Sequence, residues 1–424
     1  MGGAVLALTA IVAGAFLLQM ANGWLGLLVP ARLGAAEYPA TVVGIVVTAH
    51  SVGFLAGCLV AARIVRQVGH IRAFAALAAA VSVASLAFTI AVEPVLWTLL
   101  RLVTGFCSAG LFTIAEAWIS AQTPQKLRGR VLSLYMISNK LAVAGGQLAL
   151  AAADGGAVFF LLSSAAYSLS LIPVALNPAA APKPPALVTL NLRQLFRIAP
   201  AGVVGCFAAG LINTAVTGVL PLYGVELGFG TGTVAVLLAL MQAGSFLLQW
   251  PLGWSSDRYD RRIVIAGSAV AIAAISLLVG MLGKAAPLWG LGLLLLLWGG
   301  FALSIYALSL AHAADFADAQ DMVPLSSSLL LVWAAGSVVG PALATVAMDL
   351  TGPGGLFLYS GLVALLLALF VAWRMTRRRP LRPEERDPFV AYATTTSPVA
   401  AELDPRASEN RPPAPVDRAI DAQD

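Results

Sequence analysis

Twelve long apolar runs, separated by short polar loops, dominate this sequence of 424 residues. A helix needs about 20 apolar residues to cross the hydrocarbon of a bilayer. Because 59% of the residues are hydrophobic and only 11% are charged, the chain has too little polar surface to cover a soluble globule. We therefore predict an all-α membrane protein embedded in a lipid bilayer. Its twelve transmembrane helices are expected over 4–29, 40–62, 73–92, 95–119, 131–152, 157–176, 199–222, 233–252, 263–282, 287–311, 325–348 and 356–373.

A proline-rich segment, 177–198, divides these runs into two sets of six. We expect a six-helix bundle over 1–176, a central loop over 177–198 and a second six-helix bundle over 199–373. The remaining residues, 374–424, are rich in proline and carry both signs of charge, so we expect a disordered tail.

The arginines and lysines gather in alternate loops, which predicts the orientation of the bundle. One side holds Arg63, Arg66, Arg72, Lys126, Arg128, Arg130, Lys183, Arg193, Arg197, Arg258, Arg261, Arg262, Arg374, Arg377, Arg378, Arg379 and Arg382. The other side holds Arg32 and Lys284. Because cytoplasmic loops carry the excess of basic residues, we expect both termini in the cytoplasm. The same scattering over short loops argues against a nucleic-acid partner, despite a net charge of +5.

The two halves superpose at an offset of 191 residues. Asn22 and Pro30 then fall on Asn213 and Pro221, with the same spacing in both halves. Parallel six-helix repeats place a substrate site at their interface, near the middle of the membrane. Rocking of one repeat against the other then exposes the site to each side in turn.

Three motifs resemble those of the major facilitator superfamily. Gly253-x-x-x-Asp257-Arg258-x-Asp260-Arg261-Arg262 is similar to its loop motif Gly-x-x-x-Asp-Arg-x-Gly-Arg-Arg, with Asp260 in place of the second glycine. Arg101-Leu-Val-Thr-Gly105 resembles an Arg-x-x-x-Gly motif of the fourth span. Gly336-Ser-Val-Val-Gly340-Pro341 resembles a signature of exchangers that in the family belongs to the fifth span.

The resemblance covers roughly residues 4–375 and implies a secondary transporter of the bacterial inner membrane, acting as a monomer. It implies that the first, fourth, seventh and tenth helices line a central cavity. A narrower resemblance, to the YcaD-like branch, brings no substrate with it. That resemblance is carried by His70-Ile-Arg72, Glu116-Ala-Trp118, Arg128-Gly-Arg130 and Ala311-His-Ala-Ala-Asp315.

The charged loop of the second half is a candidate gate. We expect Asp257 to pair with Arg258, Arg261 and Arg262, so that ion pairs between neighbouring helices hold the cytoplasmic side closed. At the offset of 191, Arg66 and Gln67 replace the first acid and base, so the first half lacks this pair. Glu116 is expected to take the place of that acid by pairing with Arg63, Arg66 or Arg130. For Arg66 and Arg130, a role in topology alone is equally open.

Ionisable residues at bilayer depth are costly and mark functional sites. His50 and Lys140 fall near the middle of their spans, and Arg101 lies in the outer third. No Asp or Glu reaches this central zone, which favours an anionic substrate that an arginine can bind bidentately. Alternatively, Lys140 pairs with Glu116 or snorkels, and Arg101 reaches the headgroups. His50 is a candidate for proton coupling, or else bonds a neighbouring helix.

Other polar groups are candidates for the cavity wall: Gln19, Asn22, Trp24, Asn213, Thr214, Thr217, Ser304 and Tyr306. Asn22 and Asn213 lie at equivalent depths, and hydrogen bonding between helices is their alternative role. The pairs Gly53-x-x-x-Gly57 and Gly336-x-x-x-Gly340 predict close helix contacts.

No motif supports an enzyme, a cofactor or a metal site, and the phosphate-binding loop of an ATP-driven pump is absent. The sequence favours a secondary transporter of a small organic solute, preferably an anion, with proton-coupled export. The alternatives are a multidrug exporter and a membrane receptor without transport activity.

Overall fold

All twelve predicted spans are helical in the computed structural model. The structure describes residues 2–153, 156–176, 182, 192–317, 321–377, 379, 386–390, 396–404 and 406, and these residues contain helices but no strands. Most of the predicted central loop therefore lies outside the described residues. The long helices are α1 (Gly2–Ala35), α2 (Ala40–Val68), α3 (His70–Ala87), α4 (Pro94–Gln122), α5 (Arg128–Ala152), α9 (Pro200–Glu226), α10 (Thr231–Arg258), α11 (Arg261–Leu282), α14 (Met322–Thr351) and α15 (Gly355–Met375).

Two of the predicted spans are broken into shorter helices. The sixth consists of α6 (Val158–Leu169) and α7 (Leu171–Ala175), and the tenth of α12 (Leu288–Ala302) and α13 (Ile305–Ala314). Within the described residues, eleven spans are long and apolar enough to cross a membrane. The exception is α5, which carries Arg128, Arg130, Asn139, Lys140 and Gln147. The short helix α8 (Leu192–Ile198) precedes α9.

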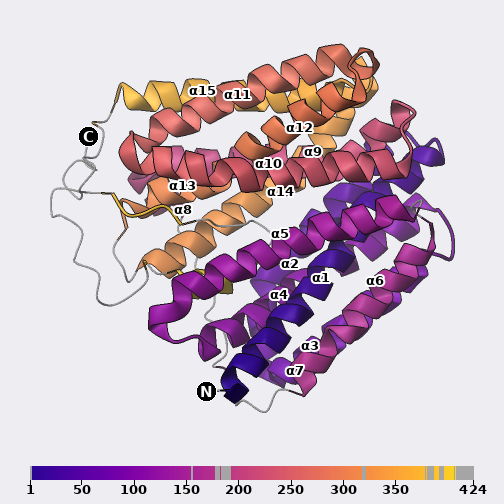
Figure 1. Ribbon diagram of the computed structural model, residues 1–424, viewed down its shortest axis with the longest axis vertical. Helices are drawn as coiled ribbons and strands as arrows, with labels where there is room; N and C mark the ends of the chain where they lie inside the picture. The colour runs from indigo at the N-terminus through magenta and orange to yellow at the C-terminus, as the bar shows by residue number, and fades with distance from the viewer. Residues whose placement is uncertain are drawn as a thin grey trace.

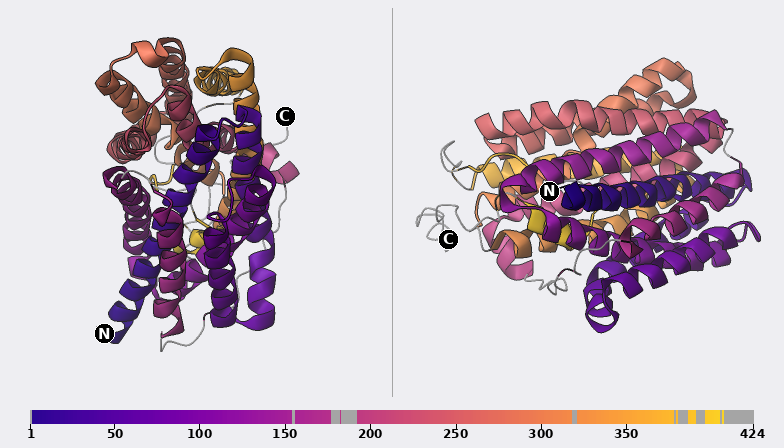
Figure 2. Two further views of the ribbon diagram at one scale, coloured as in Figure 1. Left: turned by 90° about the vertical axis from the view of Figure 1, so that its right-hand side faces the viewer. Right: turned by 60° about the horizontal axis from the view of Figure 1, so that its bottom comes forward.

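The helices form two bundles that lie side by side (Figure 1). Helices α1–α7 make the first bundle, drawn in indigo to magenta, and α9–α15 make the second, drawn in rose to yellow. Rotated views show the same separation (Figure 2). The predicted all-α fold of twelve helices in two bundles is thus confirmed.

Glycines let several helix pairs approach closely, as predicted. A Cβ atom added to Gly53 of α2 would lie 2.1 Å from the carbonyl oxygen of Leu102 on α4. One added to Gly336 of α14 would lie 2.3 Å from the carbonyl oxygen of Phe207 on α9. Gly57 and Gly340 make similar approaches in the same two helix pairs. These contacts leave no room for a side chain, so they fix the crossing of each pair.

We call the end of the molecule that holds the α2–α3, α4–α5 and α10–α11 connections the basic end, because the arginine-rich loops lie there. At the opposite end the two bundles touch. The Asp349 carboxylate on α14 accepts hydrogen bonds from the backbone N–H groups of Ala40 (3.2 Å) and Thr41 (3.1 Å) at the start of α2. Gly44 also packs against Thr345, so the opposite end is closed.

The chain after α15 differs from the expected disordered tail. Residues 386–390 and 396–404 lie against the helices at the basic end, and the 3₁₀ helix η5 (Pro398–Leu403) contacts α4, α5 and α14. Val399, Ala400, Ala401 and Leu403 are buried there. The yellow η5 is visible between the bundles in Figure 2. Short apolar stretches in a polar tail are a weak signal in sequence, and only the groove between the helices gives them a place to pack.

Candidate functional site

A cavity of about 260 Å³ lies between the two bundles. Side chains of α1, α2, α4 and α5 line it on one side, and those of α9, α10 and α14 line it on the other. Eight of the predicted residues line its wall: Gln19, Asn22, His50, Arg101, Lys140, Asn213, Thr214 and Thr217. Residues from remote parts of the sequence thus converge on one polar site.

Three of the predicted cavity residues, Trp24, Ser304 and Tyr306, do not line this cavity. Trp24 Nε1 donates to the carbonyl oxygen of Gly146 (2.7 Å), and Ser304 Oγ donates to that of Gly300 (2.7 Å). Tyr306 is 2% exposed and packs edge-to-face against Trp333, with 6.4 Å between the ring centroids. Trp333, and not Tyr306, lines the cavity. The break between α12 and α13 lies directly before Tyr306, and a count of residues along an unbroken helix cannot reveal the direction of its side chain.

Sequence reasoning also missed several residues of the wall. Gln147, Gln242 and Ser245 line the cavity. Gln147 stands seven residues after Lys140 on α5, and Ser245 three residues after Gln242 on α10, so each pair shares one helix face. A search for polar residues at helical spacing within the apolar runs would have found both faces.

Lys140 joins the two bundles at the cavity. Its Nζ atom donates to Ser245 Oγ and to Gln249 Oε1, each over 2.6 Å. The ammonium group thus crosses from α5 to α10 and neither snorkels nor pairs with Glu116. Both acceptors are neutral, so the charge of Lys140 is solvated by dipoles without being neutralised.

Arg101 brings a second positive charge to the cavity. Its side chain is 5% exposed and lines the cavity, so it does not extend to the headgroups. The guanidinium makes no hydrogen bond or ion pair with a described residue, and its Nε atom is buried without a partner. A buried donor without a partner costs about 1–3 kcal/mol, which a ligand that accepts the hydrogen bond would recover.

The repeat-related asparagines have different surroundings. Asn22 Oδ1 accepts hydrogen bonds from Ser108 Oγ (3.0 Å) and Tyr167 Oη (2.8 Å), so this side chain connects α1 to α4 and α6. Both side-chain polar atoms of Asn213 are buried without a partner. Asn22 thus makes the hydrogen bonds between helices that were its alternative role while it also lines the cavity, and Asn213 offers a free amide to the cavity.

His50 lies beside the close contact of α2 with α4. Its Nδ1 atom is 3.5 Å from Thr104 Oγ1, and its carbonyl oxygen would lie 2.0 Å from a Cβ atom on Gly105. Gly105 belongs to the Arg-x-x-x-Gly motif, so the motif brings both Arg101 and His50 to the cavity. The glycine provides the close approach and the arginine provides the charge.

The charged loop between α10 and α11 forms ion pairs within the second bundle. Arg261 is buried and pairs with Asp315 after α13 (2.7 Å) and with Asp257 (3.3 Å). The Arg258 guanidinium lies 4.0 Å from the centroid of the Trp254 ring. Of the three expected pairs of Asp257, the described residues show the one with Arg261, which joins α10 to α11. Arg258 lies over the Trp254 ring and Arg262 pairs with Asp260 instead. Within the described part of the chain, however, none of these arginines has a salt bridge to the first bundle.

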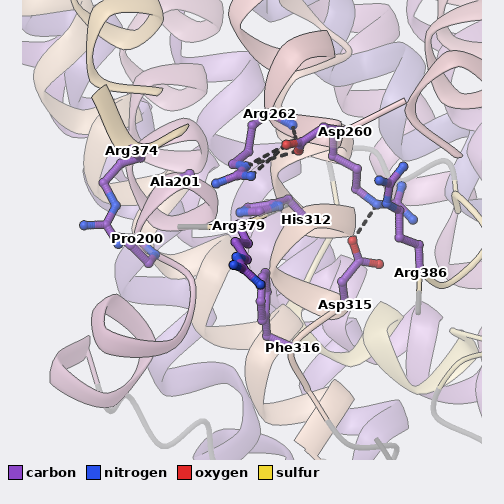
Figure 3. Close-up of a pocket in the computed structure, with 11 residues that line it drawn as sticks. Pro200, Ala201, Asp260, Arg262, His312, Asp315, Phe316, Arg374, Arg379 and Arg386 are labelled. Atoms are coloured by element: carbon purple, nitrogen blue, oxygen red, sulfur yellow. Dashed lines mark hydrogen bonds and ion pairs between the residues drawn. The ribbon is translucent and has the colours of Figure 1, made fainter. Parts of the chain in front are cut away.

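Asp260 replaces a glycine of the family motif and has a structural role at the start of α11. It caps the start of α11, accepting from the backbone N–H of Arg262 (3.0 Å), and also forms an ion pair with the Arg262 guanidinium (2.7 Å; Figure 3). Partial burial favours the neutral acid, but the hydrogen bonds from Arg262 prevail and lower the pKa of Asp260. The carboxylate therefore stabilises the helix start throughout the neutral range.

Glu116 has partners other than those predicted. Its carboxylate is fully buried and accepts hydrogen bonds from Tyr135 Oη (2.9 Å) and from the tail residue Ser397. Arg63, Arg66 and Arg130 are exposed and form no salt bridge with it. The expected pairing is wrong because Glu116 faces the inside of the groove, whereas these arginines face outward.

Two helical bundles with a polar cavity at their interface define a multi-pass membrane transporter. The chain belongs to the Major Facilitator Superfamily, whose family model matches residues 11–322 and, again, 204–401. The two matches begin within α1 and α9, the first helices of the two repeats. The resemblance seen in the sequence motifs is thereby confirmed.

Two relatives with similar sequences bear the family's name without a named solute. The chain is 27% identical to an uncharacterized MFS-type transporter of Yersinia pestis over 392 residues, covering 90% of this chain and 97% of that one. It is 23% identical to the uncharacterized MFS-type transporter YcaD of Salmonella enteritidis over 364 residues, covering 85% and 94%.

Solved structures with the same fold include transporters of different solutes. The nucleoside transporter NupG superposes with a TM-score of 0.75 at 12% identity, covering 88% of this chain and 100% of that one. A bacterial homologue of the lysosomal transporter Spinster, inward-facing and occupied, gives 0.72 at 13% identity, covering 91% and 99%. A D-xylose–proton symporter gives 0.65 at 15%, covering 87% and 97%. At these identities the likeness concerns the fold.

Proposed function

We propose that this protein moves a small organic anion across the bacterial inner membrane by alternating access. One observation carries the proposal: the cavity wall has the cationic side chains of Arg101 and Lys140, and no Asp or Glu among its described residues. The basic end faces the cytoplasm, in keeping with the excess of arginine there. Each copy of the chain holds a complete cavity, so we expect a monomer to be active.

The preference for an anion rests on the absence of a counter-charge to Arg101 and Lys140 on the described cavity wall. A cation at bilayer depth is costly to bury, and such residues pair with an opposite charge or with backbone carbonyls. Lys140 has only neutral acceptors, and the Arg101 guanidinium has no hydrogen-bond acceptor among the described residues. A carboxylate or phosphate on the solute would supply the missing charge, and the arginine fork suits its two oxygens.

The partnerless amides suggest what the rest of the solute carries. Asn213 offers both a donor and an acceptor, and Gln147 Oε1 is a buried acceptor without a partner. A solute with hydroxyl or amino groups beside its anionic group would satisfy these atoms. Such groups also occur in the solutes named for NupG and for the D-xylose symporter. Those solutes carry no anionic group, however, so they would leave the charges of Arg101 and Lys140 without a counter-charge.

The size of the cavity disfavours the multidrug alternative. Pockets for drug-sized ligands span about 300–1,000 Å³, whereas this cavity holds about 260 Å³. Its wall also carries the positive charges of Arg101 and Lys140 with no Asp or Glu among its described residues, and a lipophilic drug would leave both charges without a counter-charge. Polar side chains from both bundles face this cavity, which favours a transporter over a receptor that has lost transport.

We propose His50 as the proton-coupling group, because it is the one histidine on the described cavity wall. Export is favoured over uptake by the similarity of Gly336–Pro341 to the exchanger motif. Liposomes with the protein in known orientation and an imposed pH gradient would test both. Coupling predicts that the His50→Gln variant loses gradient-driven flux and keeps solute exchange. Uptake driven towards the basic end would contradict export.

Flux measurements in proteoliposomes test the anion preference. A panel of organic acids, amines and sugars is first screened for thermal stabilisation of the purified protein, and the solutes that bind are then assayed for counterflow. We expect acids to be transported, and Arg101→Gln or Lys140→Gln to lower their transport at least about tenfold, the effect of roughly 1.4 kcal/mol. Arg72→Gln is the matched control, since Arg72 is exposed at the basic end. Normal acid transport by both cavity variants would rule the proposal out, and failure of every solute would favour the receptor.

A further inference from the structure

The described tail segments contact both bundles at the basic end. Residues 386–390 lie against the second bundle. There the backbone N–H of Phe389 donates to both carboxylate oxygens of Asp257, over 3.0 and 3.2 Å. The N–H of Asp387 donates to Asp315 Oδ1 over 3.1 Å, and Arg261 donates to the Asp387 carbonyl oxygen. The tail therefore bonds Asp257 and Arg261 of the loop motif, together with Asp315 after α13.

The Phe389 ring fits a space that a glycine leaves open. A Cβ atom on Gly253 would lie 2.4 Å from Phe389 Cδ1, so the ring lies directly on the helix backbone. Gly253 is the first residue of the charged loop motif. Arg386, the residue at the start of this tail segment, donates to the carbonyl oxygen of Tyr259, and its position beside Asp315 is visible in Figure 3.

The second tail segment lies between the bundles. Ser397 donates to Glu116 Oε2 of α4 through its backbone N–H (2.8 Å) and its hydroxyl (2.5 Å). Ser120 of the same helix donates to Glu402 (3.0 Å). Across the groove, Ser327 of α14 donates to the carbonyl oxygen of Pro398 (3.1 Å). One short 3₁₀ helix is thus held by α4 of the first bundle and α14 of the second.

The position of η5 prevents one half of the transport cycle. Because the opposite end is closed by the contact of α2 with α14, the cavity can open there only if the bundles rock and close at the basic end. Four buried residues of η5, Val399, Ala400, Ala401 and Leu403, fill the groove into which the helices would have to move. The bundles cannot close while η5 occupies it.

We infer that residues 386–390 and 396–404 form an autoinhibitory latch that holds the protein open at the basic end and must withdraw before the cavity can open at the other. We call these residues the tail latch. The inference rests on the alternating access proposed above and requires no particular solute. Fully buried Glu116 gives the latch its specificity, because withdrawal removes two of the hydrogen bonds to its carboxylate.

Electron–electron distance measurements on spin-labelled protein test the latch without a solute. Labels on the variants Gln125→Cys and Ile263→Cys would report the separation of the bundles at the basic end, since both positions are exposed there and lie on different bundles. The three native cysteines are buried. We expect the full chain to give one long distance, and a chain ending at residue 385 to gain a shorter population. A chain ending at 406 keeps the latch and serves as the control.

A synthetic peptide of residues 386–406, added to the chain ending at 385, should restore the long distance. If that short chain does not fold, the full-length double variant Phe389→Ala with Ser397→Ala replaces it, and the shorter population is again expected. An unchanged distance distribution in the shortened or doubly substituted protein, or a peptide without effect, would overturn the latch. Because no solute is present, a failure of the anion proposal leaves this result unaffected.

Discussion

At the residue scale, one residue type at equivalent positions of the two halves has different hydrogen bonding. Asn22 and Asn213 are equivalent in the repeat, yet Asn22 accepts two hydrogen bonds within its own bundle and Asn213 has no partner. The difference comes from the neighbours, because Ser108 and Tyr167 supply donors to Asn22 alone. A repeat conserves the position of a side chain in its helix, but the facing helix decides its role.

Substitution of the two asparagines should separate stability from transport. Asn22→Ala leaves the hydroxyls of Ser108 and Tyr167 without their acceptor, so we expect a loss of about 1–3 kcal/mol and a lower melting temperature of the purified protein. Asn213→Ala removes an amide that bonds nothing, so we expect unchanged melting and a reduced rate of counterflow. Equal melting of the two variants would contradict this assignment.

At the element scale, backbone contacts at glycines set the positions of the helices that carry the site. Gly244 on α10 faces α12 so closely that a Cβ atom would lie 1.7 Å from the carbonyl oxygen of Leu296. The helix α10 also carries Ser245 and Gln249, the acceptors for Lys140. A shift of this helix therefore disturbs both the packing of the second bundle and the contact across the cavity.

Gly244→Ala should destabilise the protein by about 1–3 kcal/mol, the usual cost of overpacking. The obstacle is backbone and cannot rotate away, so α10 and α12 must separate. Gly267→Ala on α11 is the matched control, because a Cβ atom there meets nothing within 4 Å. Thermal unfolding in detergent compares the two. Similar melting temperatures would show that α10 and α12 pack less closely than described.

At the scale of the whole molecule, the protein is closed at one end and wedged at the other. Asp349 stabilises the closed end by accepting from the N-terminus of α2, where a carboxylate is electrostatically favoured. The tail latch fills the basic end. Both sets of contacts join the bundles and favour the same conformation, so both have to break during transport.

A disulfide across the closed end should stop transport reversibly. A Cβ atom on Gly44 would lie 2.9 Å from the Cβ atom of Thr345, closer than the roughly 3.8 Å of a disulfide, so Gly44→Cys with Thr345→Cys can cross-link after a sub-ångström shift. We expect counterflow to cease under oxidant and to return under reductant. Each single variant is the control. Undiminished flux through the cross-linked protein would contradict alternating access.

Local properties of the sequence sufficed for the class of protein, the twelve spans and the family. Hydropathy, loop charge and motif spacing are read within about 20 residues, the length that crosses a bilayer. The spans hold even where α6–α7 and α12–α13 are broken, because a kink changes direction without changing hydropathy. Six of the charged and amide candidates, Gln19, Asn22, His50, Arg101, Lys140 and Asn213, lie on the cavity wall as predicted, because a polar group within an apolar run is costly in contact with lipid.

Tertiary structure alone decided which groups are partners. Nothing near Glu116 in the sequence indicates that Ser397, 281 residues away, donates hydrogen bonds to its carboxylate. Likewise, nothing near Asp257 indicates that the backbone N–H of Phe389 donates to it. The Tyr306 side chain likewise packs against Trp333 and does not line the cavity. A buried polar group needs a hydrogen-bond partner, and the packing of the helices decides which donor or acceptor lies within reach. The partner is therefore determined by the assembled bundles.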